Sequence, residues 1–232
     1  PDGKRLYVGS YKTVLVWDTS TLELVGRLEG HDDYVTKILA SADGQRVYVA
    51  SREIHAYNAD NLQRLAVWPG HADFITALAG TKDGTKVISA GSDGRVLAWD
   101  PAAGTSTTLM SVPKLEAMSL AILPKEDLVV VGLSDGTVRG LDFKGGAPKI
   151  AHVHNDWVLD LAVTPDGRVY SSSRDRNVAM HVPGQGPRAL TLQAHRGSVR
   201  RLALDPDDYL ISMGDDGDVY VWAPKTYEMV AR

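Results

Sequence analysis

The sequence predicts an all-β fold built from six units of about 40 residues, and three observations support this prediction. A short turn motif recurs at a nearly constant interval. A histidine opens most of the units. Between these markers lie short runs of β-forming residues, and no stretch shows the 3.6-residue period of an amphipathic helix.

The turn motif is first met as Pro1-Asp2-Gly3. Proline presets the first turn residue and Asp-Gly tolerates the positive φ that follows, so the motif predicts a turn between two antiparallel strands. Its second residue stands at positions 2, 43, 83, 126, 166 and 207, which gives steps of 41, 40, 43, 40 and 41 residues. The even spacing indicates one such turn in each of six units.

The histidine marker agrees with this division. It is present as His31, His71, His154 and His195, and the gap of 83 residues between the second and third spans two periods, with Lys114 in the skipped place. We therefore expect a single domain over 1–232. Its units lie at about 1–30, 31–70, 71–113, 114–153, 154–194 and 195–232.

Each unit contains four short strand-like runs, which in the third unit read ITALAGT, KVISAGS, RVLAWD and STTLMSV. Inner runs such as Val14-Leu15-Val16-Trp17 are apolar at every position, so neighbouring sheets must cover both of their faces. Four strands per unit, a period near 40 residues and sheets packed face to face predict a β-propeller.

Composition excludes several classes of protein. The chain has 232 residues, no cysteine and a formal net charge of −4 from 25 basic and 29 acidic residues. We expect an intracellular, cytoplasmic protein without disulfides, and no nucleic-acid or membrane partner, because no global positive field is present. No run approaches the roughly 18 to 20 apolar residues of a membrane span.

The third unit resembles a WD repeat over GHADFITALAGTKDGTKVISAGSDGRVLAWD, with Gly70-His71 at its start and Trp99-Asp100 at its end. The sixth and first units are similar, with Trp222-Ala223 and Trp17-Asp18 at this place. Other units have drifted, and carry Tyr57-Asn58, Leu141-Asp142 and His181-Val182 instead. The whole chain thus resembles the WD-repeat propeller family, a fold that hosts many functions.

The resemblance implies that each unit is a blade with strands a to d from a central channel outward, and that the Asp-Gly turn joins strands a and b. The first unit then has strands b (RLYVGS), c (TVLVWD) and d (ELVGRLEG) but lacks its innermost strand a, while TYEMVAR is the last strand d. We expect a fragment of a six- or seven-bladed ring. Its open first blade offers an edge for self-association.

Two units carry sets of four polar and aromatic residues, namely His71, Ser89, Asp93, Trp99 and His195, Ser212, Asp216, Trp222. Serine, histidine and aspartate are also the residue types of a hydrolase triad. A triad is needed once per site, however, whereas this set recurs. The resemblance implies structural hydrogen-bonded tetrads, and the fifth unit keeps His154, Ser171 and Asp175 with His181 at the tryptophan place. We expect no catalytic residue.

A metal or cofactor site is not expected either. His152 and His154 beside Asp156 offer the one hint of a metal site, but a third protein ligand is not visible. No glycine-rich phosphate loop stands between a strand and a helix.

Candidate binding residues lie on the loops. Three residues after the opening histidine come Tyr34, Phe74 and Trp157, a place that in the resembled family lies near the channel mouth and contacts partners. The alternative is that each ring packs on its own blade as a plug. The b–c loop residues Arg174 and Arg176 and the d–a loop residue Arg196 are expected on the same rim, where arginine suits a carboxylate or phosphate.

These residues predict a non-catalytic protein-interaction scaffold or peptide-recognition module within a larger protein or complex. Its expected partner is a protein or peptide with an acidic or phosphorylated segment. The alternative is a propeller-type enzyme with a site at the channel mouth, which would need histidines or carboxylates gathered there from several blades.

Overall fold

The computed structural model describes residues 2–124, 128–182 and 190–232, together with the side chains of all of these except 151 and 152. Within these ranges the chain forms β-strands and no helix, so no described segment is a helix able to cross a membrane. The chain divides into two compact units, 1–114 and 115–232. The expected turn at 125–127 lies outside the described residues, as does Pro1.

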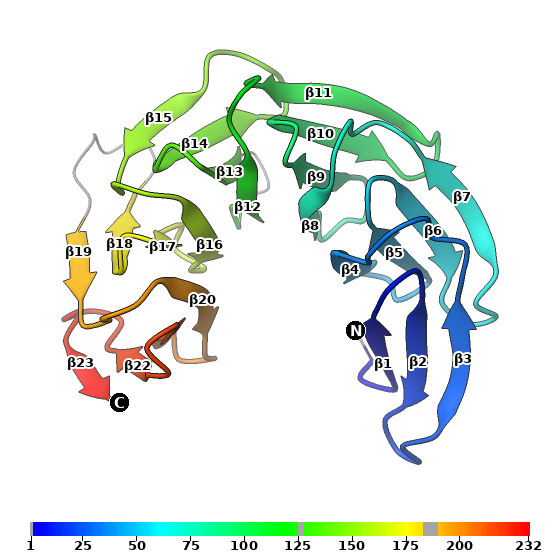
Figure 1. The fold of residues 1–232 in the computed structure, drawn as a ribbon, viewed down its shortest axis with the longest axis horizontal. Helices are drawn as coiled ribbons and strands as arrows, with labels where there is room; N and C mark the ends of the chain where they lie inside the picture. The colour runs from blue at the N-terminus through cyan, green and yellow to red at the C-terminus, as the bar shows by residue number, and fades with distance from the viewer. Residues whose placement is uncertain (1, 125–127, 183–189) are drawn as a thin grey trace. The chain divides into compact units, whose positions relative to one another are not determined.

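The first compact unit contains three antiparallel sheets, ordered β1-β2-β3, β4-β5-β6-β7 and β8-β9-β10-β11. Their strands are β1 (Arg5–Gly9), β2 (Val14–Asp18), β3 (Leu24–Leu28), β4 (Lys37–Ala40), β5 (Arg46–Ala50), β6 (Ile54–Asn58), β7 (Arg64–Trp68), β8 (Ile75–Gly80), β9 (Val87–Gly91), β10 (Arg95–Asp100) and β11 (Thr105–Ser111). In Figure 1 these strands run from blue to green, and the strands of each sheet lie side by side in chain order.

The second compact unit also contains three sheets, each with four antiparallel strands in chain order. The strands are β12 (Ala117–Ile122), β13 (Leu128–Leu133), β14 (Thr137–Asp142), β15 (Lys149–His152), β16 (Val158–Val163), β17 (Val169–Ser173), β18 (Asn177–His181), β19 (Leu190–Gln193), β20 (Val199–Leu204), β21 (Leu210–Gly214), β22 (Val219–Trp222) and β23 (Met229–Ala231). This repeated sheet topology confirms the predicted all-β, blade-like architecture.

The first sheet has three strands, and β1 pairs with β2 alone. Like β5 and β9, β1 follows an Asp-Gly turn directly, so it occupies the place of the second strand. The prediction that the first unit lacks its innermost strand is confirmed. One edge of β1 consequently carries backbone groups that no neighbouring strand of this sheet pairs.

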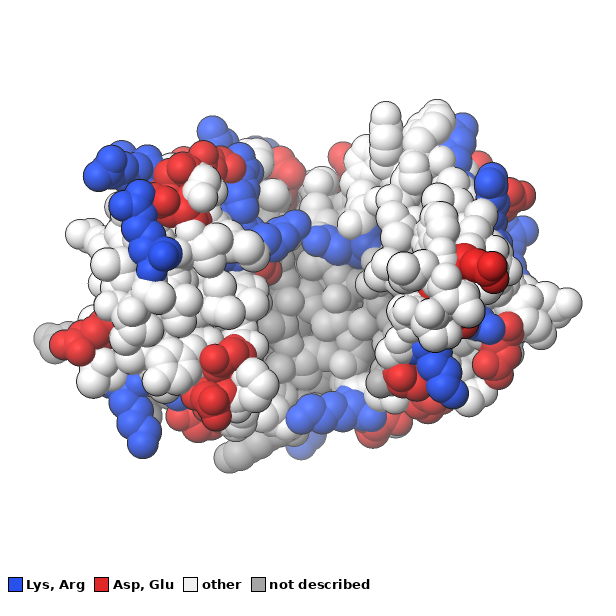
Figure 2. Space-filling view, turned by 90° about the horizontal axis from the view of Figure 1, so that it is seen from below, with Lys and Arg blue, Asp and Glu red and all other residues white. Residues whose placement is uncertain are grey.

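One face of the first sheet is apolar and exposed. Leu6 pairs with Trp17 and Val8 with Leu15, so these four side chains share a face, while Val14 and Val16 point the other way into the core. Leu6 and Val8 are 56% and 42% exposed. At the right of Figure 2, the surface around the first sheet is largely uncharged, with charged side chains gathered toward its borders.

The cores lie between neighbouring sheets of each unit. Val14, Val16, Val47 and Tyr57 are buried between the first and second sheets. Trp68 and Trp99 stack between the second and third sheets with ring centroids 5.6 Å apart. In the second unit, equivalent clusters join the fourth sheet to the fifth and the fifth to the sixth. Covering both faces of an inner sheet in this way explains its unbroken apolar strands.

The innermost strand of four sheets begins with a register shift. The pairing of β8 with β9 shifts between Ile75 and Ala77, and the same shift recurs at the start of β12, β16 and β20. Each is a β-bulge, in which one extra residue lies opposite the partner strand and turns its side chain away from the regular alternation. In β20 that extra residue is Arg200.

Candidate functional site

The third sheet brings together His71, Ser89, Asp93 and Trp99. His71 Nδ1 lies 3.0 Å from Asp93 Oδ1, and His71 Nε2 lies 2.7 Å from Ser89 Oγ. Because an ionised carboxylate only accepts hydrogen bonds, Nδ1 carries the proton and the serine hydroxyl donates to Nε2. Trp99 Nε1 donates to the same Ser89 Oγ over 2.9 Å. The network ties the loop before β8 to strands β9 and β10.

The sixth sheet repeats this arrangement with His195, Ser212, Asp216 and Trp222. The Trp222 Nε1 to Ser212 Oγ distance is again 2.9 Å, and His195 Nε2 lies 2.9 Å from the same hydroxyl. In the fifth sheet His154 contacts Ser171 at 2.8 Å and Asp175 at 3.1 Å. The three serine residues Ser89, Ser171 and Ser212 are completely buried.

The electrostatics of these networks follow from burial and hydrogen bonding. Burial would raise the pKa of Asp175, but hydrogen bonds from the His154 imidazole and the Asn155 amide outweigh it and lower the pKa to about 2. Burial also lowers the pKa of His71 despite the neighbouring Asp93. In the third sheet a neutral imidazole therefore faces an ionised carboxylate.

The fifth sheet departs from the tetrad at one position. His181 pairs with Val169 as Trp99 pairs with Val87, so it occupies the tryptophan place. His181 is 6% exposed, and its Nδ1 has no hydrogen-bond partner among the described residues. Burial, with a smaller contribution from His154, lowers the pKa of His181 to about 4.

The second sheet departs further. Val49 pairs with His55 as Ser89 pairs with Leu97, so an aliphatic side chain stands at the serine place and a histidine stands where leucine does. Tyr57 stands at the tryptophan place, and its hydroxyl lies 3.1 Å from His31 Nε2. The sequence revealed Tyr57 in this position but not the neighbouring His55.

The rim of the first compact unit is formed by loops that follow the second and fourth strand places of its sheets. Tyr34 is 62% exposed and lies against Tyr11, with ring centroids 4.8 Å apart. The Arg52 guanidinium lies 4.7 Å from the centre of the Phe74 ring and 3.7 Å from Asp33. The positions of Tyr34 and Phe74 within the sequence repeat predicted them on this rim. The sequence did not indicate that Tyr11 and Arg52 are their neighbours.

The corresponding rim of the second unit carries Trp157 and Arg174. The Arg174 guanidinium lies 5.2 Å from the centre of the Trp157 ring and 3.9 Å from Asp156. Trp157 is half-buried, whereas Arg174, Arg176 and Arg196 are exposed. Arg176 adopts a positive φ of 74° at its turn.

Carboxylates near this rim pair selectively. Asp215 forms an ion pair with Arg200 at 2.7 Å, and Asp218 forms one with Arg232 at 2.8 Å. Asp216 accepts a hydrogen bond from the backbone amide of Arg196. The Arg196 guanidinium forms no ion pair within the described part of the chain. Arg176 and Arg196 therefore retain their charge without a described acidic partner.

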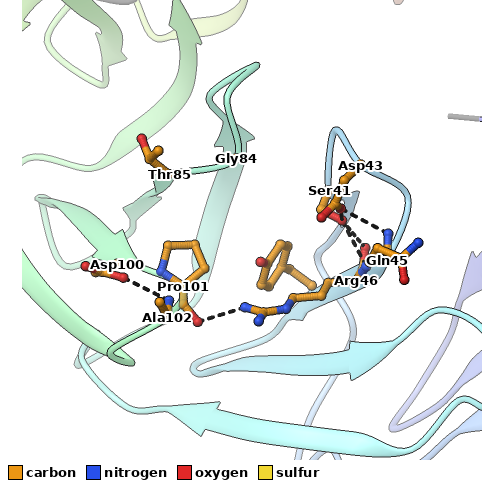
Figure 3. A pocket seen from close by; sticks show the side chains of 10 residues that line it. Ser41, Asp43, Gln45, Arg46, Gly84, Thr85, Asp100, Pro101 and Ala102 are labelled. Carbon is orange, nitrogen blue, oxygen red and sulfur yellow. Dashed lines mark hydrogen bonds between the residues drawn. The ribbon is translucent and has the colours of Figure 1, made fainter.

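The opposite rim of the first unit holds a groove of about 620 Å³ between the second and third sheets. Figure 3 shows Arg46 reaching across it toward Pro101, whose carbonyl oxygen accepts a hydrogen bond from the guanidinium over 2.8 Å. Equivalent hydrogen bonds from a guanidinium to a carbonyl oxygen join Arg5 to Ala59 and Arg168 to Pro224. The sequence signal for these hydrogen bonds is a repeated Arg-x-Tyr at 5–7, 46–48 and 168–170.

No cluster of three or more potential metal ligands occurs among the described residues. His154 is engaged by Ser171 and Asp175, while the side chain of His152 lies outside the described part of the chain.

Comparison with known proteins adds to this geometry. The chain matches the family "WD domain, G-beta repeat" over residues 62–100, 149–181 and 186–223. It is 26% identical over 148 residues to the guanine nucleotide-binding protein subunit beta of Saccharomyces cerevisiae, an alignment that covers 58% of this chain and 35% of the relative.

Two further relatives match shorter segments. The transcriptional repressor rco-1 of Neurospora crassa is 43% identical over 65 residues, 27% of this chain and 11% of the relative. The mouse WD repeat-containing protein 90 is 30% identical over 118 residues, 47% of this chain and 6% of the relative. The chain thus spans about a third or less of each of these proteins. Together with the repeated sheets, the matches confirm the resemblance to WD-repeat proteins found in the sequence: three segments of the chain match WD repeats of the G-beta type.

Proposed function

We propose that this chain is a non-catalytic protein-interaction module that holds a segment of a partner on the rim carrying Trp157. The observation that carries the proposal is Arg174, whose guanidinium lies over the Trp157 ring at 5.2 Å while half of its side-chain surface stays exposed. An aromatic ring that is half-buried under an exposed cation is suited to anchor an apolar group beside an acidic one.

The chemistry of this rim favours an acidic or phosphorylated segment. Arg174, Arg176 and Arg196 each present a planar guanidinium, which binds carboxylate or phosphate through paired hydrogen bonds. Asp156 is 3.9 Å from Arg174, which is too long for a strong hydrogen bond, so an incoming anion can replace it at small cost.

The buried serines support a role without catalysis. Ser89, Ser171 and Ser212 have no exposed surface, and each hydroxyl already donates to a histidine. A nucleophile must approach its substrate within about 3 to 3.5 Å, and no substrate reaches these oxygen atoms in the folded chain. One relative is by name a subunit of a guanine nucleotide-binding protein, which agrees with a role in an assembly.

Two further parts of the proposal concern where and how the chain works. The absence of cysteine supports an intracellular, cytoplasmic location. The unpaired edge of β1 and the exposed Leu6 and Val8 support self-association through the first sheet, since an open edge beside an apolar face accepts another strand or sheet.

The binding proposal is tested with a library of peptides that carry glutamate, aspartate or phosphoserine at a central position, measured by fluorescence polarisation. We expect Trp157→Ala to weaken the selected peptide by about 2 kcal/mol, or roughly 30-fold, as for a central anchor. Arg174→Glu with Arg196→Glu should weaken it further, and added salt should act in the same direction.

Lys225→Glu is the matched control, because Lys225 is exposed in the same compact unit but lies in the turn between β22 and β23. It should leave peptide binding unchanged. A folded Trp157→Ala protein that binds the peptide normally would place the site elsewhere. If Trp157→Ala unfolds the chain instead, the ring is a structural plug.

A further inference from the structure

The second sheet buries two histidines against each other at the base of the loop that carries Tyr34. His31 and His55 are 3% and 5% exposed, and their ring centroids lie 4.5 Å apart with an interplanar angle of 33°. No other described unit stacks a second imidazole on its loop histidine in this way. The pair therefore distinguishes this loop from those before β8 and β20.

The hydrogen bonds fix the protonation of His31. Tyr57 Oη donates its one proton to the Glu29 carbonyl oxygen, which lies 2.8 Å away. The hydroxyl can then only accept from His31, so Nε2 at 3.1 Å carries the imidazole proton and Nδ1 carries none. This Nδ1 atom is buried and has no partner among the described residues.

The equivalent nitrogen is provided with an acceptor in three other units. Nδ1 of His71, His154 and His195 lies 3.0 to 3.1 Å from the carboxylate of Asp93, Asp175 and Asp216. In these units the proton on Nδ1 is paired with a negative charge. A proton that arrives at His31 would be buried with nothing to accept its hydrogen bond, which is costly in a low-dielectric site.

The surrounding charges do not rescue the protonated form. Burial lowers the pKa of His31 to about 4, and His55 and Arg64 of β7 act in the same direction, while Asp32 opposes them. Burial and Arg64 also lower the pKa of His55, against Glu53, which lies 3.7 Å from His55 Nε2 on the β5–β6 turn. Both rings are thus held neutral.

We propose that His31 and His55 form an acid-sensitive latch: protonation of the pair releases the loop 29–34 from the sheet and displaces Tyr34 from the rim. Besides the Tyr57 bond to the Glu29 carbonyl, the loop is held by the Lys12 amide on the Asp33 carbonyl and by the Arg52 ion pair with Asp33. Only the consequence for partner binding rests on the function proposed above.

The direction of the effect follows from linkage. In the released loop an imidazole titrates near its ordinary pKa of about 6.5, whereas His31 in the closed loop does so near 4. The closed loop has its full stability above about pH 6.5 and loses it as the pH falls toward 4. Each histidine that is freed in this range increases the open population by up to about tenfold per pH unit.

The test is hydrogen exchange of the whole chain at about pH 7 and about pH 5, corrected for the intrinsic exchange rate. We expect protection of amides in 29–36 to fall at least about tenfold between the two conditions. Amides in 69–76, the loop of His71, serve as the internal control and should lose less protection, because the hydrogen bond and charge of Asp93 offset part of the burial that lowers the pKa of His71. The variant His31→Gln with His55→Leu should remove the acid effect, because Leu97 already fills the second of these places in the third sheet.

Equal pH dependence in 29–36 and 69–76 would overturn the latch, and so would an unchanged acid response in the double variant. If that variant folds poorly, an NMR titration of the wild-type histidines decides instead. A ring at position 31 or 55 that titrates near 6.5 while the loop stays protected contradicts the proposal. No partner is present in these experiments, so their failure leaves peptide binding at Trp157 untouched, and failed peptide binding leaves the latch untouched.

Discussion

Trp99 Nε1 and His71 Nε2 meet on one hydroxyl, since Ser89 Oγ lies 2.9 Å from the first and 2.7 Å from the second. The serine donates to the imidazole and accepts from the indole, so both capacities of its hydroxyl are used on protein atoms. This shared oxygen atom joins two strands and a loop of the third sheet, so the tetrad forms one connected hydrogen-bond network.

Removing members of this tetrad should cost stability in a defined order. We expect Trp99→Ala to lower the free energy of unfolding by about 3 to 5 kcal/mol through lost burial and a cavity beside Trp68. Ser89→Ala should cost about 1 to 2 kcal/mol, because the indole and imidazole lose their common partner. Urea unfolding measures both. A covalent adduct of a fluorophosphonate probe on Ser89 or Ser212 would contradict the structural interpretation.

The carboxylate of Asp175 should make stability depend on acid. Its folded pKa of about 2 lies below the ordinary value of 3.8, so its contribution is present above about pH 4 and is lost as the pH falls toward 2. Asp175→Asn should therefore destabilise the chain by about 2 kcal/mol at neutral pH and by about half as much near pH 3. The exposed Asp207→Asn is the control, and an equal loss at both pH values would refute the assignment.

The hydrogen bond from Arg46 to the Pro101 carbonyl oxygen should stabilise the packing of the second sheet on the third. Arg46→Lys shortens the reach to the Pro101 carbonyl and removes the planar donor, so we expect a loss of about 1 kcal/mol in unfolding free energy. Lys4→Ala serves for comparison, because the Lys4 side chain is 80% exposed and its ammonium lies 3.8 Å from Asp2. Similar losses for the two variants would show that the hydrogen bond adds nothing beyond a surface contact.

The apolar face of the first sheet should govern the association state. We expect Leu6→Lys with Val8→Lys to shift any dimer of this chain toward monomer by at least about tenfold in Kd, measured by sedimentation equilibrium. Leu22→Lys adds charge at a side chain that is 76% exposed on the turn between β2 and β3, outside that face. It should leave association unchanged. Dimerisation that survives the double substitution would place the contact elsewhere.

The fifth sheet offers a gain-of-stability test at His181. His181→Trp supplies an indole N–H where Ser171 Oγ lies, as Trp99 does for Ser89 and Trp222 for Ser212. We expect unfolding free energy to rise by about 1 kcal/mol, and more below pH 6.5, because the neutral histidine contributes full stability above that pH and loses it toward 4. His181→Phe fills the space without the donor and should gain less; a phenylalanine variant at least as stable as the tryptophan variant would refute the hydrogen bond.

Much of the fold could be predicted from the sequence because the signals are local. The Asp-Gly turns fix where two strands meet, and Asp43 caps its own turn by accepting from the Gln45 amide. The doubly apolar run at Val14–Trp17 predicted cover on both faces, and the core between the first two sheets supplies it for Val14 and Val16. For Leu15 and Trp17 the prediction was wrong, because no described sheet covers the face that they share with Leu6 and Val8. The absence of a strand beside β1 was predicted because only one side of the first Asp-Gly turn carries a strand-like run.

The parts that escaped prediction depend on how one sheet packs on the next. Arg46 and Pro101 are 55 residues apart, and their contact is set by the packing of two sheets rather than by any local pattern. In the sequence, nothing distinguishes His55 from other strand residues. Its contact with the His31 ring depends on the pairing of β5 with β6 and on the fold of the loop before β4. The exposure of the rim aromatics was equally hidden: Tyr34 is open to solvent, whereas Phe74 and Trp157 lie half-buried under arginines.

The bulge at the start of β8, β12, β16 and β20 has a consequence for the variability of the rim. Pairing resumes after the extra residue in the same register in all four sheets, so each of these inner strands begins with the same local backbone geometry. We expect side chains at loop positions such as 72–74 and 155–157 to tolerate substitution without sliding the strands beneath them, as long as His71 and His154 are kept. The repeat thus separates the side chains of its rim loops from the frame of paired strands that carries them.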